Sequence, residues 1–128
     1  MKRPTLGTTG FDIAPIVFGG NVLGWTTNEA ESFRVLDAFI DHGFDTIDTA
    51  DIYSAWADGH SGGESETVLG KWFAARPGMR DKVKLFTKVG SDMGGPGEKG
   101  LSEAWITKAV EKSLARMQVE TIDLYFSH

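Results

Sequence analysis

Short apolar runs alternate along the chain with longer stretches in which apolar residues recur every three or four positions. The short runs predict buried strands, and they occupy residues 16–20, 44–49, 83–87 and 121–128. The longer stretches predict amphipathic helices at about residues 29–41, 65–75 and 102–117. Residues 3–15 alternate in the manner of a short β-hairpin.

Capping residues support the helix boundaries. Residues 26–28, Thr-Thr-Asn, offer N-cap side chains for the first helix, and Gly43 is placed to end it. Ser102 has the same capping role at the start of the third helix. A hairpin followed by strands and helices in alternation predicts right-handed crossovers and a parallel sheet. Four such strands form either a small open sheet or the first half of an eight-stranded barrel, within one domain spanning residues 1–128.

Composition and charge exclude several classes of partner. The net charge is −5 and basic residues form no stripe, so nucleic acid and anionic membranes are poor partners. The chain has no cysteine, which removes disulfides and cysteine-based metal sites, and no metal site is expected. No run approaches the ~18 apolar residues of a membrane span. We therefore expect a cytoplasmic domain that does not enter a membrane.

Four residues with catalytic chemistry lie at or just past the predicted strand ends: Asp48, Tyr53, Lys88 and His128. The carboxyl ends of parallel strands meet at one edge of a sheet, so these side chains are expected to converge. Reduction of a carbonyl needs a proton donor for the developing alkoxide. A tyrosine phenol has an ordinary pKa near ~10, and a neighbouring cation favours release of its proton. An Asp–Lys pair at a strand end also occurs as a purely structural ion pair.

Five ordered motifs resemble the aldo-keto reductase family. They are Leu6–Ile13 (LGTTGFDI), Gly43–Ala50 (GFDTIDTA), Glu64–Gly70 (ESETVLG), Thr87–Gly90 (TKVG) and Ile122–His128 (IDLYFSH). The resemblance spans the chain and implies the first half, strands one to four, of a (βα)8 TIM barrel. It implies NADPH-dependent reduction of aldehydes or ketones to alcohols.

Residue roles also follow from the resemblance. Tyr53 would be the general acid, Lys88 and Asp48 would tune it, and His128 would orient the substrate carbonyl. Gly20 and Asn21, with Asp48, match positions beside the nicotinamide, although Asn21 replaces a frequent aromatic residue. Two loop tryptophans, Trp25 and Trp56, either line the pocket for the small carbonyl substrate or simply pack.

The chain departs from the family in length, because it ends on His128 and strands five to eight are missing. In the family those strands supply the aromatic residue that stacks on the nicotinamide and most of the contacts to the 2′-phosphate. Two readings follow: a truncated reductase that becomes active when a complementary half-barrel or self-association supplies the rest, and a half-barrel without turnover. A flavodoxin-like nucleotide- or flavin-binding module is the third. Open sheet edges predict self-association.

Overall fold

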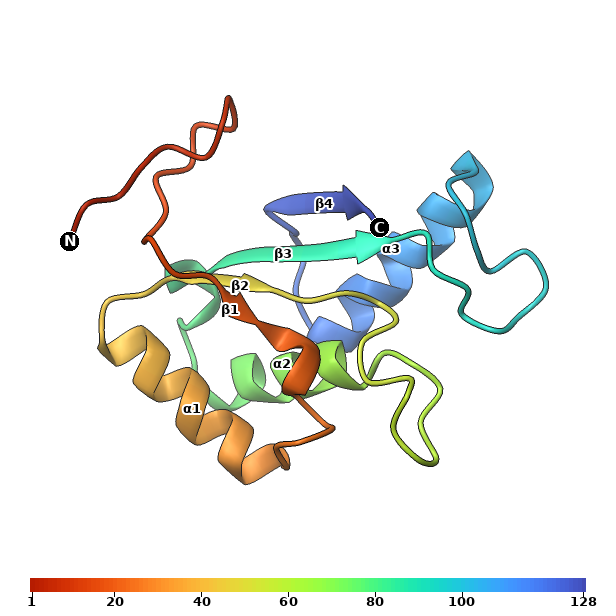
Figure 1. Cartoon of the computed structure of the whole chain (residues 1–128), viewed down its shortest axis with the longest axis horizontal. Coiled ribbons are helices and arrows are strands. Elements are labelled where there is room, and N and C mark those ends of the chain that lie inside the picture. The colour runs from red at the N-terminus through yellow and green to blue at the C-terminus, as the bar shows by residue number, and fades with distance from the viewer.

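The computed structural model describes residues 1–128 and contains one parallel sheet with three α-helices. The strands are β1 (Phe18–Gly19), β2 (Thr46–Asp48), β3 (Lys84–Val89) and β4 (Leu124–Ser127), and they lie in sequence order. The helices are α1 (Glu29–Asp41), α2 (Glu64–Ala75) and α3 (Glu103–Met117), with short 3₁₀ turns η1 (Gly20–Val22) and η2 (Arg80–Lys82). All three helices lie on one side of the sheet, and the N-terminal segment lies on the other (Figure 1).

The capping predictions are confirmed. Asn28 accepts a hydrogen bond from the Glu31 amide at the start of α1, and Ser102 accepts one from the Trp105 amide at the start of α3. Gly43 follows α1 with φ of 87°, a conformation that glycine adopts without strain. The three crossovers therefore begin and end near the residues that the sequence indicates.

The main core lies between the sheet and the helices. It combines the strand residues that face the helices with buried residues from all three helices. Its buried members are Leu23, Leu36, Ile47, Val68, Leu69, Trp72, Phe73, Val83, Leu85 and Met117. A β-carbon at Gly70 would overlap the Arg116 carbonyl, so glycine allows α2 and α3 to approach closely here. This packing fixes the helices against the sheet and leaves the opposite face of the strands available for a site.

The prediction of a fully buried strand at residues 16–20 is wrong. β1 contains only two residues, and the side chains of Ile16 and Val17 are 55% and 39% exposed. The strand lies at an edge of the sheet, and Val17 lies on the face that no helix covers. The expected hairpin is reduced to one antiparallel bridge, between Thr5 and Asp12.

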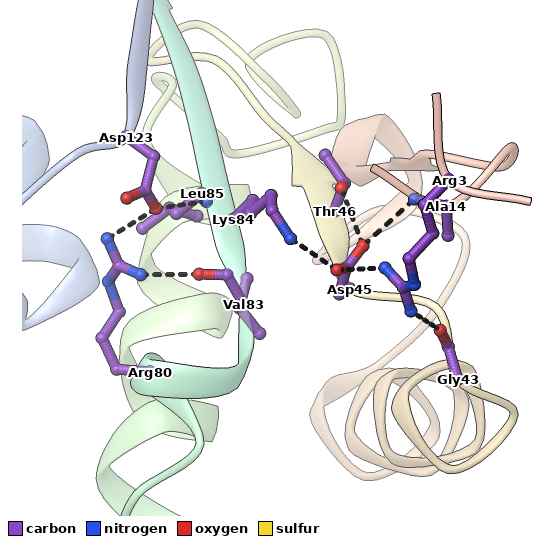
Figure 2. A network of polar contacts seen from close by, with 10 residues as sticks. All are labelled: Arg3, Ala14, Gly43, Asp45, Thr46, Arg80, Val83, Lys84, Leu85 and Asp123. Atoms are coloured by element: carbon purple, nitrogen blue, oxygen red, sulfur yellow. Dashed lines mark hydrogen bonds and ion pairs between the residues drawn. The ribbon is translucent and has the colours of Figure 1, made fainter. Parts of the chain in front are cut away.

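A polar network joins the N-terminal segment to the sheet at the strand end opposite the predicted site (Figure 2). Asp45 accepts hydrogen bonds from Arg3 and Lys84, each at 2.6 Å. Burial opposes ionisation of Asp45, but the bonds from Lys84 and Arg3 outweigh it and lower its pKa below the ordinary value. Asp123 similarly accepts hydrogen bonds from Arg80 and from the Leu85 amide.

None of the helices combines the length and the apolar character that a membrane span requires.

Candidate active site

An ion pair between neighbouring strands forms the centre of the site. Lys88 Nζ donates to Asp48 Oδ2 at 2.7 Å, and both side chains point to the uncovered face of the sheet because they alternate with the core residues of their strands. The same ammonium donates to the Thr49 carbonyl at 2.8 Å and to the Tyr53 hydroxyl oxygen at 3.0 Å. These three acceptors use all three donors of a lysine ammonium. Lys88 is therefore held in one position, with its side chain only 14% exposed.

Tyr53 comes from the loop that follows β2. Its ring also lies beneath the Lys88 ammonium, which is 4.6 Å from the ring centroid. Because Lys88 donates to the phenol oxygen, the phenol's own proton remains free for another acceptor. The site thus presents a polarised O–H group beside a fixed positive charge.

His128 follows β4 directly and completes the expected group. Its amide donates to the Val89 carbonyl at 2.8 Å, which continues the pairing of β3 with β4. The ring lies 5.9 Å from the Tyr53 ring, edge to face, and Nδ1 lies 3.2 Å from the Ser91 hydroxyl. Burial lowers the pKa of His128, and the Lys88 charge lowers it further against a smaller opposing effect of Asp48. Both effects favour the neutral imidazole.

A cavity of about 380 Å³ opens in front of three of these residues, Asp48, Lys88 and His128. Its other walls are mainly apolar and come from the N-terminal segment and the uncovered face of the sheet: Leu6, Ile13, Val17, Phe86 and Phe126. A few polar groups at one end of an apolar pocket are typical of small-molecule sites.

The two predicted loop tryptophans meet beside Tyr53. The rings of Trp25 and Trp56 lie 5.5 Å apart at 84°, and Trp56 lies 6.0 Å from the Tyr53 ring. Both indoles are about half exposed, at 50% and 48%. They form an accessible aromatic surface next to the phenol and also pack against each other.

The predicted cofactor-side residues differ in their surroundings. Gly20 is buried, and a β-carbon there would press on the Asp48 carbonyl and the Ser65 hydroxyl, each 3.1 Å away. Its carbonyl accepts a hydrogen bond from Ser65 at 2.6 Å. Asn21 is exposed in the middle of the 3₁₀ turn η1. A side chain at position 20 would therefore need its neighbours to shift by a few tenths of an ångström, whereas Asn21 is available to a ligand.

Sequence reasoning missed a buried charged network on the helix side of β3. The Glu66 carboxylate, fully buried, accepts from Thr87 at 2.6 Å and from Arg116 at 2.7 Å. Thr87 directly precedes Lys88, so this network holds the strand residue next to the site lysine. One signal was present in the sequence: Glu66 shares a helical stripe with Leu69 and Phe73, which are core residues.

A second carboxylate lies in the same region without a partner. Asp51 is 1% exposed, and neither carboxylate oxygen makes a well-aligned hydrogen bond, although the Ile52 amide offsets a small part of the effect of burial. Burial, together with the charge of Glu66, raises the pKa of Asp51 to about 6. The Tyr125 hydroxyl is also buried without a partner, and burial raises the pKa of this phenol above its ordinary value. The region behind the site therefore carries unpaired polar groups.

Comparison with known proteins identifies the relatives of the chain. The model of the aldo/keto reductase family matches residues 15–128. An uncharacterized 11.2 kDa protein in the crtE 3′ region of Pseudescherichia vulneris is 66% identical over 93 residues, which are 73% of this chain and 90% of that protein. The 6-dehydroglucose reductase of Novosphingobium aromaticivorans is 36% identical over 96% of this chain and 40% of the reductase.

A solved structure gives the same result. The aldo-keto reductase AKR11C1 from Bacillus halodurans, in its holo form, superposes with a TM-score of 0.80 at 35% identity, over 100% of this chain and 40% of that one. The chain thus spans about two-fifths of the length of these two reductases. The four-stranded sheet and helices of this chain match the N-terminal half of an aldo-keto reductase (βα)8 barrel.

Proposed function

The chain belongs to the aldo/keto reductase family, and we propose that it carries the proton-donating half of an NADPH-dependent carbonyl reductase. The observation that supports this proposal most strongly is the Lys88 ammonium, bonded at once to Asp48 and to the Tyr53 phenol. The proposed substrate is an aldehyde or ketone, and the product is the alcohol.

Tyr53 donates the proton in this proposal. As the carbonyl carbon is reduced, negative charge develops on the carbonyl oxygen, and the phenol proton moves to it. The phenolate that remains is stabilised by the Lys88 ammonium 3.0 Å from its oxygen. Asp48 and the Thr49 carbonyl keep the ammonium in place, so little reorganisation is needed as the charge forms.

His128 orients the carbonyl. Its neutral ring contacts the Ser91 hydroxyl through Nδ1. When Ser91 donates to Nδ1, the second ring nitrogen carries the proton and is free to donate to the carbonyl oxygen. The carbonyl oxygen is then held between two donors, the imidazole and the phenol. Trp25 and Trp56 supply an apolar surface for the rest of the substrate, which favours aromatic or apolar carbonyl compounds.

The residues present fit the nicotinamide end of the cofactor. NADPH supplies the hydride when it is bound. Asp48 lines the cavity with 27% of its side chain exposed, so its carboxylate offers an acceptor for an amide group, and the exposed Asn21 side chain offers both a donor and an acceptor. We propose that Gly20, Asn21 and Asp48 hold this end of the cofactor.

We propose that the remaining contacts to the cofactor come from further strands, which a complementary half-barrel or self-association supplies. β1 and β4 are edge strands, and apolar side chains on the uncovered face remain accessible, with Val17 and Phe126 each 39% exposed. Open edges beside apolar surface favour association with more sheet. A chain that stays monomeric at high concentration in light scattering would oppose self-association.

An NADPH titration followed by tryptophan fluorescence tests the cofactor proposal. Free tryptophan amide corrects for absorption by NADPH. Trp25→Phe/Trp56→Phe retains only the buried Trp72 and Trp105, so it shows whether quenching comes from the site. Saturable binding that quenches the two loop tryptophans supports a cofactor site in this chain. Absence of binding at millimolar NADPH favours the alternative, a half-barrel without turnover when alone.

A further inference from the structure

Ser54, the residue after Tyr53, has an unusual backbone conformation. Its φ is 73°, and the only other non-glycine residue with positive φ is Gln118, which ends α3. A left-handed conformation is common at a helix end but costly for serine within a loop. Such strain persists only where the surroundings impose it, and it gathers at functional sites. Ser54 is also completely buried, although it belongs to a loop.

Three hydrogen bonds hold Ser54 in this conformation. Its hydroxyl donates to the Leu23 carbonyl at 2.7 Å, which joins the loop after β2 to the segment between β1 and α1. Its carbonyl accepts from His60 Nδ1 at 3.0 Å and from the Ala57 amide at 3.2 Å, so the loop folds back on itself. The chain directly after Tyr53 is thus held through both the hydroxyl and the carbonyl of Ser54.

We propose that Ser54 is a positioning residue that aims the Tyr53 phenol at Lys88. The inference rests on the proposed function, in which Tyr53 donates the proton. The left-handed backbone turns the chain sharply after Tyr53, and the bond to Leu23 anchors the turn to a buried part of the fold. Without that anchor, the tyrosine and the neighbouring Trp56 lose their fixed position while the sheet stays intact.

Ring-current shifts in the NMR spectrum measure the position of Tyr53 without any turnover. The Lys88 ammonium lies 4.6 Å from the centre of the Tyr53 ring, so the adjacent methylene protons are expected upfield of their ordinary position. Asp48 and Thr49 hold Lys88 independently, so a lost shift reports movement of the tyrosine. Tyr53→Leu supplies the reference spectrum without the ring.

Ser54→Ala and Ser54→Gly both remove the hydroxyl, and glycine also accepts the left-handed backbone without strain, so it remains informative if the alanine variant does not fold. Each folded variant is expected to lose more than half of the upfield shift. Ser113→Ala is the matched control, since Ser113 is equally buried but its hydroxyl has no partner. A wild-type shift in folded Ser54→Gly would overturn the proposal, as would an equal loss in Ser113→Ala.

The same measurements distinguish a failure of the proposed reductase function from a failure of the positioning role of Ser54. A chain that shows the expected shifts but never reduces a carbonyl, even when joined to the rest of a barrel, retains the positioning role and loses the reductase role. In an active barrel, Ser54→Gly is expected to lower kcat with little change in KM, because substrate contacts are unchanged and proton donation is misaligned.

Discussion

The unpaired Asp51 carboxylate is expected to destabilise the folded chain at neutral pH, so Asp51→Asn should stabilise it. The pKa of Asp51 is raised from 3.8 to about 6 by burial and then by the Glu66 charge, against smaller opposing effects of the Ile52 amide, Arg116 and Lys88. At ~1.36 kcal/mol per pH unit, this corresponds to roughly 3 kcal/mol of folding free energy.

The direction of the pH dependence follows from proton binding. Between pH 3.8 and about 6 the unfolded chain has released the Asp51 proton while the folded chain keeps it, so this group's contribution to stability declines as pH rises. Above pH 6 the carboxylate is ionised in both states, and its burial lowers the stability of the folded chain by the full amount. Below pH 3.8 both states are protonated and the cost disappears. Asparagine has the shape of the protonated acid, so the variant should differ from wild type mainly at the higher pH.

Urea unfolding followed by tryptophan fluorescence at pH 4.5 and pH 7.5 measures this difference. Asp58→Asn is the control, because Asp58 is an exposed carboxylate on the same loop. We expect Asp51→Asn to gain up to roughly 3 kcal/mol at pH 7.5 and much less at pH 4.5, while Asp58→Asn changes little at either pH. A variant no more stable than wild type at pH 7.5 would refute the reasoning. So would a gain of equal size at both pH values.

Three further predictions concern other parts of the chain. Glu66→Gln should cost roughly 3 kcal/mol in urea unfolding, because Arg116 is left without its buried partner; an unchanged midpoint would contradict this. Asn28→Ala should cost about 1 kcal/mol, because the Glu31 amide loses its cap, and helix α1 should show faster hydrogen exchange at its start. The His128 ring protons should titrate in NMR with a midpoint below 6.5, since burial and then Lys88 disfavour the imidazolium; a midpoint above 6.5 would contradict the neutral ring.

The sequence predicts the order of elements and their caps because these depend on local chemistry. Asn28 and Ser102 cap their helices through residues only three positions away. The convergence of Asp48 and Lys88 was also predictable, because neighbouring parallel strands bring their ends together. The exposure of Ile16 and Val17 was not predictable, because an apolar run does not reveal whether another element covers it.

Long-range polar contacts also escaped prediction. Glu66 meets Arg116, 50 positions away, and an Arg and a Glu on separate helices ordinarily indicate solvent-exposed faces. The left-handed backbone of Ser54 has no sequence signal, since serine seldom adopts it and it is held by contacts with Leu23, Ala57 and His60 that form only in the fold.

Turnover by a completed barrel tests the central claim most directly. Residues 1–128 would replace the matching segment of the Novosphingobium aromaticivorans reductase, and folding of the chimera would be established by a single cooperative melt. NADPH oxidation at 340 nm would then be followed with a panel of aromatic aldehydes. The account predicts turnover that Tyr53→Phe reduces to near background while NADPH binding is kept. Retained turnover in Tyr53→Phe, or a folded chimera that binds NADPH and reduces no aldehyde, would contradict it.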